Sequence, residues 1–207
     1  MRRDQLYAGV VAPLIGFFGM GTAAYINRSW WSVTDNAISD LGKVGLPYNW
    51  VLNVSLVLTA LLGVYYTAGL FPLLKNSVEK AGIAVFSLGL VFLALIGLFP
   101  EGTSPHYTVS WGFFIFGSIG YLTAGLGIWL EGNRGIGILT VSLFIVEVAL
   151  AKWAFDAFPG IAIAELVGAL AIVVWHYAAL FTIFFKKWPN GREVQGRGFT
   201  RATARNR

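Results

Sequence analysis

Residues 80–106 read KAGIAVFSLGLVFLALIGLFPEGTSPH, and this stretch decides the class of fold. From residue 80 to residue 99 nearly every side chain is apolar or small. A helix needs roughly 20 predominantly apolar residues to cross the hydrocarbon core of a bilayer. Two prolines, an acid and a histidine follow directly and end the apolar run. The stretch therefore predicts a transmembrane helix that stops at a polar connection.

Apolar runs of the same length lie on both sides of this one. We expect membrane spans at about 7–27, 50–74, 80–99, 109–130, 135–154 and 160–185. Polar segments, several with proline or glycine, separate them. The predicted fold is all-α, a polytopic membrane protein whose six transmembrane helices form one domain over residues 1–187. Residues 188–207 are rich in glycine and arginine, which predicts a flexible basic tail.

The composition of the chain agrees with a lipid environment. Of the 207 residues, 57% are hydrophobic and only 12% are charged, and the mean hydropathy is +0.68. Soluble domains carry about 25% charged residues, so this chain has too few to cover a surface that faces water. Cysteine is absent, which excludes disulfides, thiol catalysis and cysteine-bound metals.

The positions of lysine and arginine predict the orientation in the membrane, because cytoplasmic loops carry an excess of both. With the N-terminus inside, twelve of the fifteen cations lie on the cytoplasmic side, seven of them within residues 186–207. We therefore expect a multi-pass protein of the cell membrane with both termini in the cytoplasm. No folded basic module accompanies the tail, so we expect it to touch anionic lipids and not nucleic acid.

Most of the acidic residues gather on the other side of the predicted bundle. Three connections and the outer halves of two spans bring six of the ten carboxylates there, together with four other polar residues: Asp35, Asp40, Glu101, Glu147, Asp156, Glu165, Asn36, Ser39, His106 and Lys152. This convergence predicts one polar site at the extracytoplasmic mouth of the bundle.

Two of these acids, Glu147 and Glu165, lie within predicted spans. A charge in the bilayer costs at least about 2.5–3.5 kcal/mol, so both should face the bundle interior, be paired or be protonated. Glu165 and His176 are eleven residues apart and share a face of an α-helix, which predicts a polar groove leading inward from the rim. Lys152 and Asp156 are four apart, so we expect them to share a helix face and pair if the fifth span reaches residue 156.

Two motifs resemble a known family. They are NAISDLG at 36–42, which we expect to dip back toward the bundle, and GLFPEGTSPHYTVS at 97–110. With six spans they resemble the prokaryotic membrane-protein family called domain of unknown function 998. The pattern is also distantly similar to a eukaryotic six-span family that includes damage-regulated autophagy modulators and a factor for lipid remodelling of glycosylphosphatidylinositol anchors. The resemblance implies the architecture and marks Ser39, Asp40, Pro100 and His106 as family positions.

The first functional hypothesis is a protein that binds or modifies a lipid or a lipid-linked headgroup at the outer leaflet. A carboxylate and an imidazole at the interface can act as base and orienting group, so Asp40, Glu101 and His106 are the candidate catalytic residues. The candidate substrate-binding residues are Asn36, Ser39, Glu147, Lys152, Asp156, Glu165 and His176. A divalent metal is a sub-case, although no closely spaced metal-ligand motif is present.

Two other classes of function stay open. A proton- or ion-coupled transporter would use Glu147, Glu165 and His176 as an intramembrane relay. A non-catalytic membrane scaffold would keep the same polar groups for structural reasons. The sequence does not decide whether the protein is an enzyme.

Overall fold

The computed structural model describes residues 1–187 and confirms an all-helical membrane architecture. Six helices are long and apolar enough to cross a bilayer. They are α1 (Arg3–Ile26), α2 (Trp50–Leu70), α3 (Ser77–Leu98), α4 (His106–Leu130), α5 (Arg134–Ala157) and α6 (Ala162–Lys187). Two short 3₁₀ helices, η1 (Ser39–Gly42) and η2 (Phe71–Leu73), lie before and after α2. The predicted tail at 188–207 lies outside the described residues.

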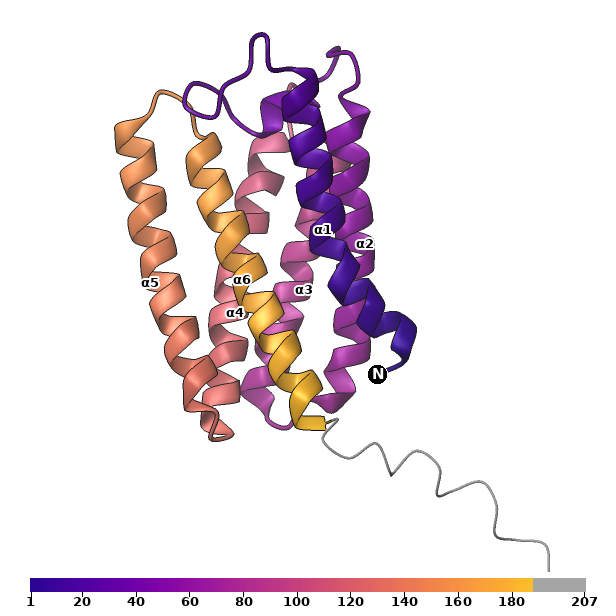
Figure 1. Cartoon of the computed structure of the whole chain (residues 1–207), viewed down its shortest axis with the longest axis vertical. Coiled ribbons are helices and arrows are strands. Elements are labelled where there is room, and N and C mark those ends of the chain that lie inside the picture. Colours follow the sequence, from indigo (N-terminus) through magenta and orange to yellow (C-terminus); the bar gives the residue numbers. More distant parts are fainter. Residues whose placement is uncertain (188–207) are drawn as a thin grey trace, which may run out of the picture.

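The six helices run side by side and are joined at alternate ends (Figure 1). We call the end that carries the connections 27–49, 99–105 and 158–161 the loop-rich end, and the opposite end the terminal end. The N-terminus and the last turn of α6 both lie at the terminal end, as the even number of helices requires. By the distribution of lysine and arginine, the loop-rich end is the one predicted to face outward.

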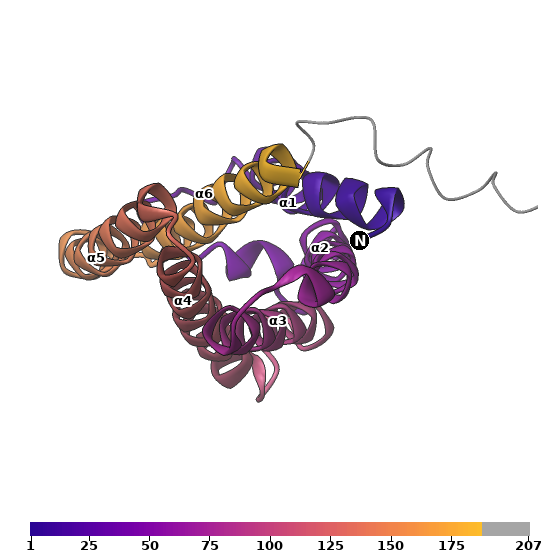
Figure 2. The same cartoon turned by 90° about the horizontal axis from the view of Figure 1, so that it is seen from below.

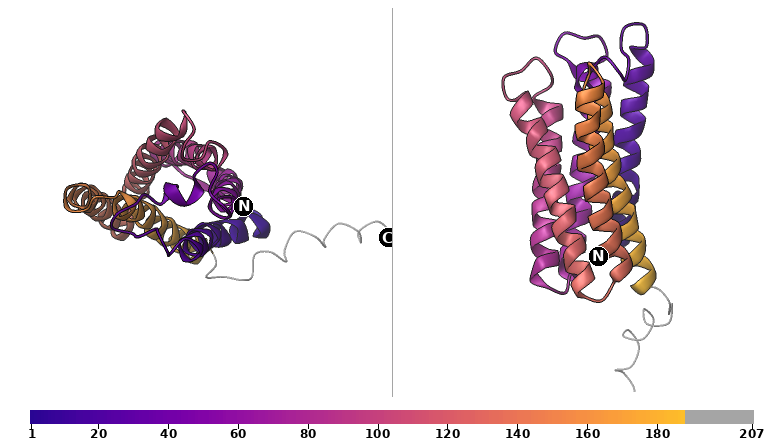
Figure 3. Two further views of the ribbon diagram at one scale, coloured as in Figure 1. Left: turned by 90° about the horizontal axis from the view of Figure 1, so that it is seen from above. Right: turned by 90° about the vertical axis from the view of Figure 1, so that its left-hand side faces the viewer.

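Viewed along the bundle, α1, α2, α3, α4 and α6 form a ring (Figures 2 and 3). Helix α5 lies outside this ring, against α4 and α6. The short helix η1 is visible within the ring when the bundle is seen from either end. The first extramembrane connection therefore does not stay on the surface but returns to the centre of the bundle.

Local sequence signals set the ends of the helices at the terminal end. The side chain of Asn76 accepts a hydrogen bond from the Glu79 N–H at 2.9 Å and so caps the start of α3. Asn133 accepts from the Ile136 N–H at 3.2 Å and caps α5 in the same way. Gly132 precedes it with φ +90°, a conformation that glycine adopts without steric cost and that turns the chain from α4 into α5.

Helices α3 and α4 pack with their backbones unusually close, because glycines face each other along the contact. A Cβ atom on Gly89 would lie 2.7 Å from the Gly117 nitrogen, and one on Gly120 would lie 2.5 Å from the Phe86 Cα. Small residues permit this approach in membranes, where van der Waals packing and not the hydrophobic effect drives helix association. The tight α3–α4 pair forms one wall of the ring.

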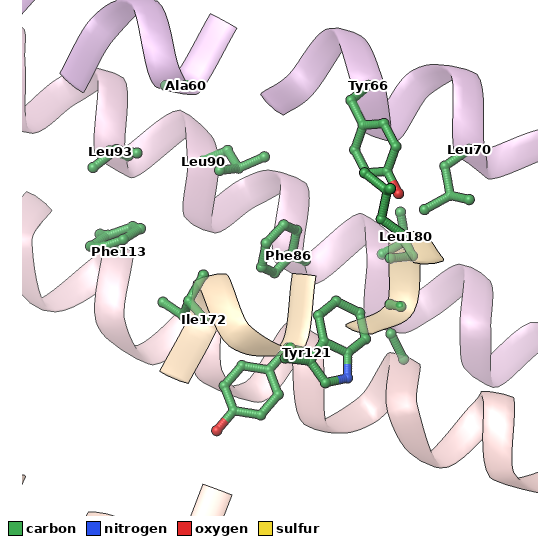
Figure 4. Close-up of a cluster of buried hydrophobic side chains, with 14 of the residues drawn as sticks. Ala60, Tyr66, Leu70, Phe86, Leu90, Leu93, Phe113, Tyr121, Ile172 and Leu180 are labelled. Carbon is green, nitrogen blue, oxygen red and sulfur yellow. The ribbon is translucent and has the colours of Figure 1, made fainter. Parts of the chain in front are cut away.

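Apolar side chains from α2, α3, α4 and α6 meet inside the ring and form the main core. Figure 4 shows Phe86, Leu90 and Leu93 of α3 opposite Phe113 and Ile172. Toward the terminal end the core is filled by large aromatic residues, and the rings of Tyr121 and Trp175 stack with centroids 5.8 Å apart. Dense packing at that end contrasts with the space that remains nearer the loop-rich end.

Candidate functional site

Residues 37–42 fold back into the loop-rich end of the ring, and we call them the roof segment. Leu41 is fully buried and packs with Ala23, Leu52 and Ala162 from three different helices. The Trp31 indole N–H donates to the Ala37 carbonyl at 2.8 Å, and the Asn53 amide donates to the Gly42 carbonyl at 2.9 Å. Buried apolar contacts and side-chain donors at both ends thus hold the roof segment, including η1, inside the loop-rich end of the ring.

Two of the predicted site residues, Asn36 and Asp40, hold the roof segment in shape. The Asn36 side-chain oxygen accepts from the Ser32 N–H at 3.0 Å, and its carbonyl accepts from the Ala162 N–H at 2.9 Å. Asp40 Oδ2 accepts from the Ala37 N–H at 2.8 Å. The side-chain bonds stabilise turns within the connection, and the Asn36 carbonyl links it to the start of α6. Both side chains therefore hold the backbone in place.

Asp35 lies just before the roof segment and is exposed. Its carboxylate accepts hydrogen bonds from the hydroxyls of Ser32 and Thr34, and these bonds lower the pKa of Asp35 below its usual value. Hydrogen bonds to the charged form of a carboxylate favour that form. Asp35 therefore stabilises the loop surface as an anion and takes no part in the interior.

Glu165 joins the roof segment to the first turn of α6. Its Oε2 accepts a hydrogen bond from the Ile38 N–H at 2.5 Å. The backbone N–H of Ser39 also faces this carboxyl group, and the carboxylates of Asp40 and Glu101 lie near enough to interact with it electrostatically. Carboxyl groups from three separate parts of the chain therefore lie on the loop-rich side, and of these Glu165 lines the cavity.

His106 is the first residue of α4 and lies between Glu101 and Ser110. Its Nδ1 is 2.9 Å from the Phe99 carbonyl oxygen, which only accepts, so Nδ1 carries a proton and donates it. The other nitrogen, Nε2, lies 3.2 Å from Glu101 Oε2 and 3.3 Å from Ser110 Oγ. The imidazole is buried, whereas the Glu101 side chain is 35% exposed.

A cavity of about 130 Å³ lies beneath the roof segment, inside the ring of helices. Side chains from α1, α2, α3, α4 and α6 line it, most of them apolar. Its polar lining residues are Ser39, Thr59, Tyr66, Ser110, Glu165 and His176. No lysine or arginine occurs among the described residues that line the cavity.

The polar groups of the cavity are divided between its ends. Ser39, Ser110 and Glu165 lie at the loop-rich end, where the roof segment and the first turns of α4 and α6 meet. His176 lies toward the terminal end, where its Nε2 donates to the Gly9 carbonyl at 2.8 Å. Apolar residues of α6, among them Ile172, line the cavity between these two groups.

Glu147 does not line this cavity, although the sequence led us to expect it at the same rim. It is buried between α4 and α5, where it accepts hydrogen bonds from Ser118 at 2.7 Å and from the Tyr121 hydroxyl. Helix α5 continues to Ala157, so Glu147 lies about 15 Å along the helix from that end. It belongs to a separate polar contact near the middle of α5.

Lys152 and Asp156 also lie apart from the cavity. Their side chains are 76% and 66% exposed and form an ion pair with each other at 2.8 Å on the surface of α5. An exposed pair of this kind contributes at most about 1 kcal/mol. Within residues 1–187, no group of three or more histidine, aspartate or glutamate side chains is placed to hold a metal ion.

The sequence names Ser110 only as one of three possible serine nucleophiles, with Ser39 and Ser104, and it does not select Ser118 or Tyr121 as site residues. Ser110 had a usable signal, because it follows His106 by four residues and therefore shares its helix face. Ser118 and Tyr121 had none, because their partner Glu147 lies in another helix.

The architecture and the comparison with known families agree. A family model described as "Protein of unknown function (DUF998)" matches residues 10–182, which run from α1 into α6. No curated protein and no solved structure matches the chain. With six apolar helices long enough to span a bilayer and a match over most of its length, this integral membrane protein belongs to the DUF998 family.

Proposed function

We propose that this protein binds a lipid or a lipid-linked molecule, with an apolar chain in the central cavity and the headgroup at the loop-rich end. The observation that carries the proposal is the mostly apolar lining of the cavity together with the polar group Ser39, Ser110 and Glu165 beneath the roof segment. A ligand that is itself divided into an oily chain and a polar head matches this arrangement.

The size and chemistry of the cavity support an apolar occupant. A cavity of about 150 Å³ lined by leucine, isoleucine and phenylalanine stays dry and binds small apolar molecules. The cavity here has about 130 Å³ and is lined by residues such as Leu90, Leu93 and Phe113. Part of a lipid chain is therefore a better occupant than water.

The charges at the polar end indicate which headgroup fits. Glu165 lines the cavity, and the carboxylates of Asp40 and Glu101 act on it from nearby. No lysine or arginine lines the described cavity to balance them. Like charges disfavour each other strongly where water is scarce, so a bare phosphate is a poor headgroup here. A head that carries an amine or hydroxyl groups can donate to these acceptors.

The side of the membrane follows from the predicted orientation. If both termini are cytoplasmic, the loop-rich end and its carboxylates face outward, and the headgroup belongs to the outer leaflet of the cell membrane.

A transporter that relays protons through Glu147, Glu165 and His176 fits the geometry less well. Glu165 and His176 are separated by eleven positions, about 16 Å along α6, and the α6 residues that line the cavity between them are apolar. Glu147 lies outside the cavity. A scaffold without a ligand is the remaining alternative, and the following experiment separates it from lipid binding.

The test is lipid capture by the purified protein. A photoreactive long-chain amine and the matching long-chain phosphate are offered in detergent, and the labelled residues are mapped by mass spectrometry. We expect labelling of cavity residues by the amine, at least about tenfold above the phosphate. Ala169 lines the cavity, so Ala169→Phe should fill it and remove labelling, whereas Ala149→Phe on the exposed face of α5 should not.

Glu165→Gln serves as the test of the headgroup. It keeps a hydrogen-bond acceptor toward Ile38 but removes the ionisable carboxyl group from the cavity. The preference for the amine over the phosphate should shrink. Equal labelling of the wild-type protein and Ala169→Phe would overturn the proposal in favour of a scaffold.

A further inference from the structure

We infer that Ser110 and His106 form a nucleophile and general-base pair that cleaves an ester bond of the lipid held in the cavity. This inference rests on the proposed function, because the lipid must first be bound there. It adds a reaction and the class of bond, and it assigns roles to two side chains.

Ser110 is the hydroxyl at the polar end of the cavity that has an imidazole beside it. Its Oγ lies 3.3 Å from His106 Nε2, and its side chain lines the cavity. Thr59, another residue of the lining, uses its hydroxyl hydrogen in a bond to the Ala12 carbonyl at 3.1 Å. Ser110 therefore combines access to the cavity with a partner that can remove its proton.

The backbone selects the tautomer that a base requires. The Phe99 carbonyl, 2.9 Å from Nδ1, holds a proton on Nδ1, so in the neutral ring the lone pair is on Nε2, which lies 3.3 Å from Ser110 Oγ. The ring is also held in place by burial, since His106 is 6% exposed. A carbonyl that orients the base takes the part that a carboxylate plays in a serine triad.

Glu101 is placed to stabilise the charge that forms during the reaction. Its Oε2 lies 3.2 Å from the same Nε2 that receives the proton. Once protonated, Nε2 can donate to this carboxylate, which lowers the free energy of the imidazolium. Glu101 thus acts as a positioning and electrostatic residue, and the bond-making atom is Ser110 Oγ.

The reaction proceeds in two balanced halves. Ser110 Oγ bonds to the ester carbonyl carbon while its proton passes to His106 Nε2. The bond from that carbon to the alcohol oxygen then breaks, and the alcohol leaves with the proton from Nε2. In the second half, water attacks the acyl-serine, gives a proton to Nε2, and the fatty acid leaves as Ser110 Oγ recovers that proton. No oxidant, reductant or metal is consumed.

A serine-directed fluorophosphonate on the purified full-length protein tests the pair. We expect one adduct, mapped to Ser110, that is lost in Ser110→Ala and retained in Ser104→Ala, which changes an exposed loop serine. His106→Gln should slow labelling about 10²-fold, the usual contribution of a general base, and Glu101→Gln should slow it less. Labelling that persists in Ser110→Ala, or a wild-type protein that resists the probe, would overturn the inference.

A second measurement does not depend on ester chemistry. Because the chain lacks cysteine, Ser110→Cys and Ser39→Cys each introduce a single thiol into the same cavity. The thiol at position 110 should react with a small thiosulfonate at least about tenfold faster than the thiol at position 39, because His106 promotes the thiolate. Adding His106→Ala should abolish the difference, and an unchanged difference would refute the pairing.

The outcomes separate this inference from the proposed function. If the long-chain amine labels the cavity but neither serine nor thiol reactivity is raised at position 110, the protein binds lipid without cleaving it. If the long-chain amine also fails to label the cavity, both the proposed lipid binding and the proposed ester cleavage are wrong.

Discussion

Ile38 donates its backbone N–H to Glu165 Oε2 at 2.5 Å, and this bond joins two residues that are 127 positions apart. It connects the roof segment with the first turn of α6, the two parts of the chain that close the cavity at the loop-rich end. The carboxylate therefore has two roles, because it supports the roof segment and lines the cavity beneath it.

Glu165→Ala should destabilise the protein more than Glu165→Gln does. Alanine leaves the Ile38 N–H without its acceptor, and an unsatisfied buried donor costs about 1–3 kcal/mol, whereas glutamine still accepts through its side-chain oxygen. Thermal unfolding in detergent measures the difference. Asp156→Ala is the control, because it breaks only an exposed ion pair and should change the unfolding temperature little. Equal effects of alanine and glutamine at position 165 would show that the bond does not support the roof segment.

Tyr121→Phe should lower the stability of the contact between α4 and α5. The change removes the hydroxyl that donates to Glu147 Oε2 in a buried site, at an expected cost of about 1–3 kcal/mol. Unfolding in detergent is the measurement. The double variant Tyr121→Phe with Glu147→Gln should be less destabilised than the sum of the two single variants, because the two groups interact directly. Additive effects would mean that the two side chains are not coupled.

Gly120→Ala should force α3 and α4 apart. The new Cβ would lie 2.5 Å from the Phe86 Cα, and backbone atoms cannot give way as a flexible side chain can. Overpacking of this kind costs about 1–3 kcal/mol. Gly21→Ala is the matched control, because a Cβ there meets no atom within 4 Å. If both variants unfold at the same temperature as the wild type, that result would contradict the close packing of the α3 and α4 backbones at Gly120.

The orientation of the bundle can be tested with single cysteines in this cysteine-free chain. Ser104→Cys lies at the loop-rich end and Gly135→Cys at the terminal end, and both positions are exposed. A maleimide that does not cross membranes should label the first in intact cells and the second only after permeabilisation. The reverse pattern would place the termini outside the cytoplasm.

The fold class was predictable from sequence because each helix carries its own signal. A run of about 20 apolar residues must be a helix in lipid, since the backbone has no other way to satisfy its polar groups there. The return of residues 36–42 toward the bundle was also expected from their hydrogen-bonding groups. Two partners of that segment were not predictable, because Asn53 and Glu165 reach it from α2 and α6.

The arrangement of the ionisable residues was predictable only in part. Glu101 and His106 are five residues apart, so their contact follows from one short connection. Glu147 was expected at the same rim, but its depth depends on how far α5 continues and on which helix faces it. Helix-to-helix rotation fixes such contacts, and hydrophobic periodicity is weak in helices that meet lipid on one side and protein on the other.

The ring of helices closes between α1 and α6, where His176 and Tyr177 donate to the carbonyls of Gly9 and Val10. The two helices that lie farthest apart in this sequence, α1 and α6, are therefore the two that complete the ring. A nascent chain with five inserted helices has neither Glu165 beneath the roof segment nor the α6 wall. A variant that ends before α6 should therefore leave the cavity open along the side that this helix covers.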